Sequence, residues 1–387
     1  MFLKKLFYPF VCIALSGLFF TACDDDEGFP EGDTPGDGKV VEAIIVNEGQ
    51  WQKNLGSLSV IYKDGTSNID VFRQVNNRPL GDQTQDITCI NDMYFVPLGS
   101  SQKVEVVDPS TFESKGTILF EQPSMPQHIV AISDNKAVVS DLKNQLTVIS
   151  TVAPYGKATE CIPVESVVSY MLMAEGKLFA MTQDGVMVYN PDALAAGPVK
   201  KFSDVVPMTD KTKFNLDKRG ILWVLGWEGS DGTGYPNGQD GLTLTGINTQ
   251  TLEVAKKMNI PVATGAGIKS GDIVPYPSFS FPRTDMVEDD IYFTVRTASE
   301  DGSDENSLLS VFVFNTQNFE YRHVIDCKNV QTMYGFGVSP AREIYVLDCL
   351  DFSPLLGYAH QYKADGSVVS INVGVFPTDV YFPDKHK

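Results

Sequence analysis

Large aromatic side chains stand among amides and cations in several long polar segments of this chain. Flat apolar rings and hydrogen-bonding side chains together suit a bulky, rigid, partly polar ligand. The chemistry that these residue types favour is therefore binding. The candidate ligand-binding residues are Trp51, Arg78, Gln85, Gln127, His128, Lys143, Tyr170, Trp227, Tyr235, Phe279, Arg296, Tyr334 and Phe352.

Some of these aromatic residues have a simpler alternative. Trp227 and Phe279 could pack beneath their own loops and contribute only to the core. Trp51 is harder to explain in that way, because it lies between Gln50 and Gln52 in a polar segment.

Catalytic signals are sparse. Among the four histidines, His128 alone begins a strand-like run beside the candidate residues, where it could act as a base or reach a metal such as corrinoid cobalt. A hydrogen-bonded structural histidine is the alternative. The sequence contains no Gly-x-Ser-x-Gly elbow, His-Glu-x-x-His motif or phosphate-binding loop. We therefore expect no catalytic residues and a protein that is not an enzyme.

Two acidic runs raise the question of calcium. Carboxylates suit Ca²⁺, but neither run has the spacing of an EF-hand loop, so we expect solvated loops and no metal site. The runs contain Asp231, Asp240, Glu300, Asp301, Asp304 and Glu305.

The cysteines show no spacing typical of zinc or haem attachment. Four cysteines remain in the mature chain besides Cys23: Cys89, Cys161, Cys327 and Cys349. Of these, Cys327 and Cys349 are the better candidates for a disulfide. Buried free thiols are the alternative.

A repeated pattern supplies the framework that must position these residues. Seven times between Ser57 and Val373 a β-rich strand runs into a polar turn and a second strand, with two more strand-like runs before most copies. The copies start roughly 40 to 66 residues apart, which suits four-stranded blades with variable loops. We predict an all-β fold, a seven-bladed β-propeller.

The two ends of the chain predict how the ring closes. Only one strand, AIIVNEG (43–49), precedes the first hairpin, and a spare strand, VGVFPTDVYF (373–382), follows the last. We expect the C-terminal strand to join the N-terminal blade and close the ring non-covalently.

Loop lengths predict a binding face. In a propeller, the loops between the second and third strands share one face with the loops between blades, and here these loops are long. The opposite face should receive turns of only two to four residues. The long segments are 48–56, 73–85, 120–128, 227–241, 261–282, 296–307 and 348–357.

The N-terminus resembles a bacterial lipoprotein signal. Residues 1–22 contain Lys4, Lys5 and an apolar stretch of about 15 residues, too short to span a bilayer, and Cys23 follows as the lipidation residue. Residues 23–40 should form a flexible acidic tether before the propeller at 41–387. The acidic run after Cys23 resembles surface-export signals, so we expect a lipid-anchored outer-membrane protein that faces the cell exterior. The alternative is that the run is an ordinary flexible spacer and that the lipid anchor faces the periplasm.

Composition sets further limits. The formal charge is −19, from 30 basic and 49 acidic residues, and such a surface repels nucleic acid. We expect no nucleic-acid partner.

Five stretches carry a family resemblance to YncE-like surface lipoproteins, over about 46–382. They are NEGQWQKNLGSLSVIY, NRPLGDQTQDI, VEVVDPSTFE, IYVLDCLDF and GSVVSINVGVFPTDVYF. That group includes the BtuG type, which captures cobalamin for an outer-membrane TonB-dependent transporter. The resemblance implies a corrinoid bound as ligand with no cofactor, a transporter as partner, and membrane contact through the lipid alone. A surface binder of a glycan, haem or siderophore, a propeller lyase or hydrolase, and a structural docking module remain alternatives.

Overall fold

The computed structural model describes residues 38–158, 160–209, 211–227, 241–264, 267–275, 282–299, 307–353 and 355–385. The predicted signal sequence, Cys23 and most of the predicted tether lie outside these residues. Among the described residues, no helix is long and apolar enough to cross a membrane.

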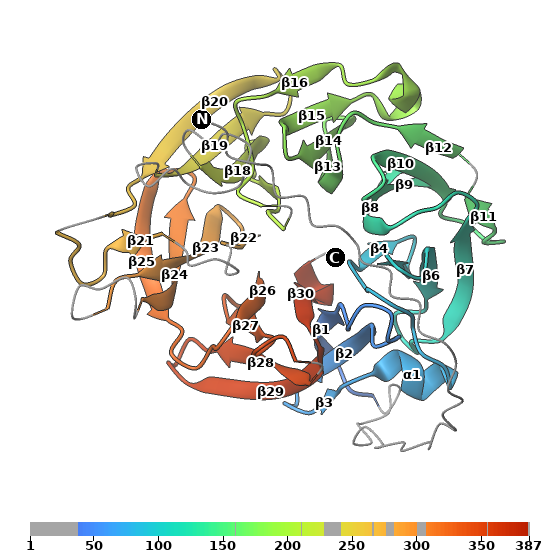
Figure 1. Cartoon of the computed structure of the whole chain (residues 1–387), viewed down its shortest axis with the longest axis horizontal. Helices are drawn as coiled ribbons and strands as arrows, with labels where there is room; N and C mark the ends of the chain where they lie inside the picture. The colour runs from blue at the N-terminus through green and yellow to red at the C-terminus, as the bar shows by residue number, and fades with distance from the viewer. Residues whose placement is uncertain are drawn as a thin grey trace, which may run out of the picture. The chain divides into compact units, whose positions relative to one another are not determined.

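Seven small antiparallel sheets surround a common centre, which confirms the predicted seven-bladed propeller (Figure 1). From the innermost strand outward, blade 1 contains β30 (Pro377–Tyr381), β1 (Val41–Asn47), β2 (Ser57–Tyr62) and β3 (Ser67–Asn68); blade 2 contains β4 (Thr88–Ile90), β5 (Met93–Leu98), β6 (Lys103–Val107) and β7 (Ser114–Phe120); blade 3 contains β8 (Pro126–Ser133), β9 (Lys136–Asp141), β10 (Gln145–Ser150) and β12 (Glu160–Pro163); blade 4 contains β13 (Val168–Ala174), β14 (Lys177–Thr182), β15 (Gly185–Tyr189) and β16 (Lys200–Phe202). Blade 5 contains β17 (Asn215–Leu216), β18 (Ile221–Trp227), β19 (Leu242–Asn248) and β20 (Glu253–Ile260); blade 6 contains β21 (Ile273–Val274) and β22 (Thr284–Val287), both paired with β23 (Asp290–Thr297), then β24 (Leu308–Asn315) and β25 (Glu320–Asp326); blade 7 contains β26 (Met333–Val338), β27 (Ile344–Asp348), β28 (Leu356–Tyr362) and β29 (Val368–Val375).

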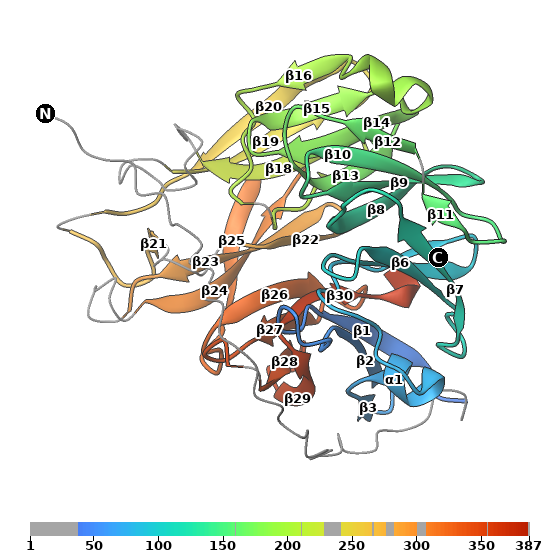
Figure 2. The same ribbon diagram turned by 45° about the vertical axis from the view of Figure 1, so that its right-hand side comes forward.

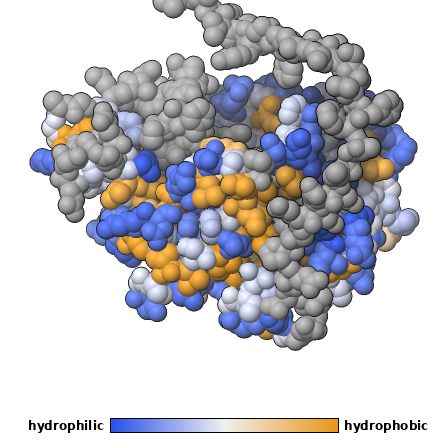
Figure 3. Space-filling view, turned by 60° about the horizontal axis from the view of Figure 1, so that its bottom comes forward, coloured by the Kyte–Doolittle hydropathy of each residue, from blue (hydrophilic) through white to orange (hydrophobic). Residues whose placement is uncertain are grey.

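Hydrophobic cores fill the spaces between neighbouring sheets. A middle strand of a blade has a sheet on both sides, so every residue of β2 is buried. Phe95 and Val106 of blade 2, for example, join Val139 and Ile149 of blade 3 in one cluster. Because a core lies on both faces, middle strands read as nearly continuous apolar runs. On the outside of the ring, apolar patches alternate with hydrophilic side chains (Figure 3).

The ring closes as predicted. β30 pairs antiparallel with β1, with Ile44 opposite Tyr381 and Ile45 opposite Val380, and the two strands lie side by side in both ribbon views (Figures 1 and 2). Phe382 continues beyond β30 into a core cluster with residues of blades 1 and 7. The 3₁₀ helix η2 (Pro383–Lys385) follows it.

The long loops share one face, here named the long-loop face, because successive strands in each blade run antiparallel. The other face is here named the short-turn face. The prediction that it receives turns of only two to four residues is wrong. Residues 190–199 link β15 to β16 there through the 3₁₀ helix η1 (Pro191–Ala196). Asn190 begins η1 by accepting a hydrogen bond from the Asp192 backbone N–H, a capping arrangement that stabilises the longer turn.

Two local features were not predicted. The helix α1 (Val71–Asn76) lies between blades 1 and 2, begins with Asp70 as its N-cap and ends at Asn77, whose φ is 52°. The short strand β11 (Lys157–Ala158), from the β10–β12 connection of blade 3, adds in parallel to the outer edge of blade 2 beside β7. Such a strand covers an edge that would otherwise expose unpaired backbone groups.

The candidate disulfide between Cys327 and Cys349 is not formed, and the alternative of free thiols holds, since the four described cysteines are all free. Both are buried in the core, and burial raises the pKa of each thiol to about 12. They therefore act as small apolar core residues.

Candidate functional site

The innermost strands leave their regular pairing at one common level of the central channel. In blades 1, 4 and 7 a β-bulge makes Thr378, Ser169 and Tyr334 extra residues opposite the second strand. In blade 3, Gln127 and His128 together face one residue of β9. A bulge turns consecutive side chains toward the same side of a sheet, so two neighbouring residues of each such strand can face the channel.

Longer excursions replace the bulge in blades 5 and 6. In blade 5 the inner edge pairs at Pro207 and again at β17. In blade 6 it pairs at β21 and again at β22. The intervening segments bring Lys211, Lys213 and Arg283 to the channel wall.

These departures build two successive rings of side chains. The first, here named the polar layer, faces the long-loop side and consists of Gln85, Gln127, Ser169, Thr212, Thr284 and Thr378. The second, here named the charged layer, follows one residue later in each strand and consists of Asp86, His128, Tyr170, Lys213, Asp285 and Asp379. Blade 7 contributes Gly335 at this level, where a Cβ would lie 2.5 Å from the Thr378 carbonyl oxygen.

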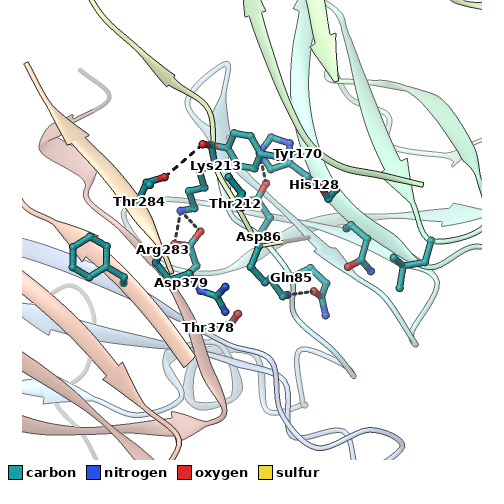
Figure 4. A pocket seen from close by; sticks show the side chains of 15 residues that line it. Gln85, Asp86, His128, Tyr170, Thr212, Lys213, Arg283, Thr284, Thr378 and Asp379 are labelled. Carbon is teal, nitrogen blue, oxygen red and sulfur yellow. Dashed lines mark hydrogen bonds and ion pairs between the residues drawn. The ribbon is translucent and has the colours of Figure 1, made fainter. Parts of the chain in front are cut away.

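Ion pairs link the blades within the charged layer. Lys213 Nζ lies 2.5 and 2.7 Å from the two carboxylate oxygens of Asp379 (Figure 4). Burial acts to lower the pKa of Lys213, but the negative charges of Asp379 and Asp285 outweigh it and raise that pKa. Lys385 Nζ lies 2.6 Å from Asp285 Oδ1. Burial opposes ionisation of Asp285, and the charges of Lys385 and Lys213 outweigh it, so its pKa is lowered.

His128 is held by protein groups at both ring nitrogens. Its Nδ1 accepts the Met171 backbone N–H at 3.3 Å, and its Nε2 lies 3.3 Å from Asp86 Oδ2. Burial lowers the pKa of His128, so the ring is neutral at pH 7 and carries its proton on Nε2, toward Asp86. The ring also packs on Tyr170, with 4.0 Å between centroids. This arrangement fits a histidine that joins blades 2, 3 and 4.

Two cavities meet at the charged layer. One of about 70 Å³ opens toward the long-loop face and contains the polar layer (Figure 4). The other, of about 780 Å³, opens toward the short-turn face. Asp86, His128, Tyr170, Lys213 and Asp379 line both. Sites for drug-sized ligands occupy about 300 to 1,000 Å³, so the smaller cavity cannot enclose a corrinoid.

A hydrogen-bonded chain begins at the smaller cavity, where Gln85, Lys211 and Arg283 line the wall, and continues on the long-loop side. Lys211 Nζ donates to Gln85 Oε1 at 3.2 Å, and Gln85 Nε2 donates to Glu48 Oε1 at 3.2 Å. The hydroxyl of Tyr334 donates to the other oxygen of Glu48, and Arg283 Nη2 donates to the Tyr334 carbonyl at 2.9 Å. These bonds connect the blade 4–5 loop with blades 1, 6 and 7, and they place amide and charged groups at the centre of the long-loop face.

Aromatic rings stand beside this chain. Tyr334, Phe352 and Phe376, here named the rim cluster, contact one another with centroid separations of 5.7 to 6.3 Å. Phe352 is 44% exposed, and Trp51, on the β1–β2 loop of the adjacent blade, is 53% exposed. Phe352 and Phe376 have φ values of 60° and 54°, which are uncommon for bulky residues and recur at binding sites.

The remaining predicted residues lie apart from the cavities or outside the described residues. Arg78 pairs with buried Glu105 at 2.6 Å and covers the Phe72 ring, which is a structural contact. Arg296 donates to Ser307, and Lys143 is exposed on the β9–β10 loop. Outside the described part are Tyr235, Phe279, the side chain of Trp227, and the acidic residues Asp231, Asp240, Glu300, Asp301, Asp304 and Glu305. In the described part, no group of three or more His, Cys, Asp or Glu side chains could hold a metal ion.

Sequence reasoning missed most of the charged layer, although a signal was present. Near the start of six innermost strands a polar residue is followed by a charged or aromatic one: Gln85-Asp86, Gln127-His128, Ser169-Tyr170, Thr212-Lys213, Thr284-Asp285 and Thr378-Asp379. Aligning the starts of the innermost strands across blades would have found them.

Comparison with known proteins agrees with this architecture. Residues 42–299 match the domain of unknown function DUF5074, and the chain belongs to that family. No curated protein matches the chain.

Solved structures share the fold at low identity. A Lactobacillus plantarum protein matches with a TM-score of 0.57 and 13% identity over 89% of this chain and 99% of its own. A Bacteroides fragilis protein, provisionally assigned as a 6-phosphogluconolactonase, matches with a TM-score of 0.56 and 12% identity over 90% and 99%. The hydrazine synthase of Kuenenia stuttgartiensis matches with a TM-score of 0.54 and 13% identity over 76% and 88%. At such identities the likeness shows the fold alone.

Proposed function

We propose that this protein is a non-enzymatic cell-surface lipoprotein, anchored through Cys23 in the outer membrane. It binds cobalamin or a related corrinoid on the long-loop face and delivers it to an outer-membrane TonB-dependent transporter. The observation that carries the proposal is the rim cluster with exposed Trp51 beside a centre of amide and charged groups.

Size and chemistry support a ligand that lies across this face. A corrinoid exceeds the cavity of about 70 Å³ beneath the Lys211–Gln85–Glu48 chain, so its macrocycle must stay above that chain. There the rings of Trp51 and Phe352 offer apolar area to its edges, while amide and ammonium groups can bond its carboxamides. Large aromatic side chains commonly contribute most of the binding energy at such surfaces.

The geometry of His128 argues against the lyase or hydrolase alternative. A general base needs a ring nitrogen that can reach the substrate, and both nitrogens here already have protein partners. Lys213 and Asp379 are likewise committed to each other. If the enzyme alternative is right, turnover of a substrate must disappear in His128→Ala.

A desalting column tests the binding proposal. Protein mixed with cyanocobalamin should carry the red ligand into the protein fraction, and the Trp51→Ala/Phe352→Ala double variant should retain at least tenfold less. Tyr321→Ala is a matched control, because Tyr321 is an aromatic residue 39% exposed on the outermost strand β25. Colour that stays entirely in the small-molecule fraction would refute a corrinoid ligand; retention of haem, a siderophore or a glycan instead would identify the alternative.

A further inference from the structure

The larger channel cavity opens on the face opposite the proposed corrinoid site. It occupies about 780 Å³, which is within the range of small-molecule sites. Its floor is the charged layer, and its rim is formed by turns of the short-turn face, including Glu288 and Arg342. The proposed function makes no use of this space.

The charges at its floor do not balance. The charged layer contains three carboxylates, Asp86, Asp285 and Asp379, against the ammonium group of Lys213, and Lys385, which pairs with Asp285, adds a second ammonium group. His128 is neutral, so the floor carries one net negative charge. A single monovalent cation would balance it.

The unbalanced charge belongs to Asp86. Of the five carboxylates that line the cavity, four have a lysine or arginine partner within 4 Å: Asp285 with Lys385, Asp379 with Lys213, Glu288 with Lys218 and Arg342, and Asp384 with Lys63. Asp86 faces neutral donors, namely the His128 ring at 3.3 Å, the Thr88 hydroxyl at 3.3 Å, and the backbone N–H groups of Ile87 at 2.8 Å and Ile129 at 3.3 Å.

Part of the lining of the larger cavity is apolar and aromatic. Tyr170 and Phe214 meet edge to face with 6.1 Å between centroids, and Leu172, Met286 and Val380 line the same space. Aromatic faces attract cations, and aliphatic walls accept a hydrocarbon body. A carboxylate at the floor of such walls suits an ammonium group that carries an apolar substituent.

We propose that the larger channel cavity binds a small organic ammonium ion, a primary amine with an aromatic or aliphatic body, whose ammonium group pairs with Asp86. The site is separate from the corrinoid site and reaches solvent through the short-turn face.

Calorimetric titration with phenethylamine tests the proposal. Wild-type protein should bind phenethylamine at least tenfold more tightly than the neutral 2-phenylethanol and should not bind 3-phenylpropionate. Asp86→Asn should weaken amine binding at least tenfold, whereas Asp365→Asn, in an exposed turn of the same face, should leave it unchanged. Equal binding of amine and alcohol, or an amine affinity unchanged by Asp86→Asn, would overturn the proposal.

A second variant keeps the test independent of folding effects at Asp86. Leu172 lines the larger cavity and not the smaller one, so Leu172→Trp should fill the space and abolish amine binding while Asp86 keeps its partners. Undiminished amine binding in Leu172→Trp would overturn the proposal. Trp51→Ala/Phe352→Ala should bind phenethylamine normally, so loss of corrinoid binding and loss of amine binding are distinguishable.

Discussion

Replacing Lys213 by methionine should destabilise the ring from its centre. Lys213 is the ammonium group that holds Asp379 of the closing strand β30, with contacts of 2.5 and 2.7 Å. Without it, Asp379, whose side chain is 18% exposed, remains as a largely buried carboxylate with no lysine or arginine partner. Breaking a buried ion pair by removing one member costs about 3 to 5 kcal/mol.

This free energy converts into a measurable shift of the melting temperature. Unfolding entropy is about 2.1 cal/mol/K per residue, so a unit of about 350 residues has about 0.7 kcal/mol/K. The expected loss is therefore about 4 to 7 °C in differential scanning calorimetry. Lys218→Met is the matched control: its pair with Glu288 is 3.4 Å long and more than half exposed, so it should cost about 1 kcal/mol or less.

A double variant separates the charge from the packing. In Lys213→Met/Asp379→Leu neither member of this ion pair is left as a lone charge, so much of the lost stability should return. The reasoning is refuted if Lys213→Met melts within 1 °C of Lys218→Met, or if the double variant is less stable than Lys213→Met.

Three other predictions follow from described contacts. Truncation after Phe376 removes β30 and the core residues Val380 and Phe382, so the protein should aggregate or lose its cooperative unfolding transition. Truncation after Lys385 is the control and should leave the melting temperature unchanged. An unchanged melting temperature of the shorter chain would contradict ring closure by β30. Burial raises the pKa of Asp70 to about 6, above its unfolded value, so this residue favours the folded state at low pH and loses that contribution as pH rises through 4 to 6. The melting temperature of Asp70→Asn relative to wild type should therefore rise by about 2 to 4 °C between pH 4 and pH 7.5, and a constant difference would be inconsistent with that shift. Phe352→Ala should lower corrinoid affinity about fivefold or more with little change in stability, because 44% of the side chain is exposed; a large melting-temperature loss would show that Phe352 is a core residue.

The sequence predicted the architecture well because its signals are local. Seven hairpin copies, with polar turns between apolar runs, predict blades, and the spare strand at 373–382 predicts the closure that β30 makes with β1. Long segments also predicted the long-loop face. The sequence left open whether Cys327 and Cys349 pair, because two cysteines in one blade region carry no information on distance; both are free and buried in the core.

The site was harder to predict because it depends on contacts between distant segments. Lys213 meets Asp379 across 166 positions, and Tyr334 meets Glu48 across 286. Neither spacing is visible as a motif. Arg78 and Arg296 were nominated by their place in long loops, yet their guanidinium groups bond Glu105 and Ser307. Bulges further decide which residues face the channel, and a bulge shifts the alternation from which sequence reasoning starts.

Hydrogen exchange read by mass spectrometry, with and without cyanocobalamin, tests most directly that a corrinoid binds on the long-loop face. Binding should slow exchange in segments 48–56 and 348–353, which carry Trp51 and Phe352, and leave the turns at 63–66 and 363–367 on the short-turn face unchanged. Protection confined to the short-turn face, or none at saturating cyanocobalamin, would contradict the account.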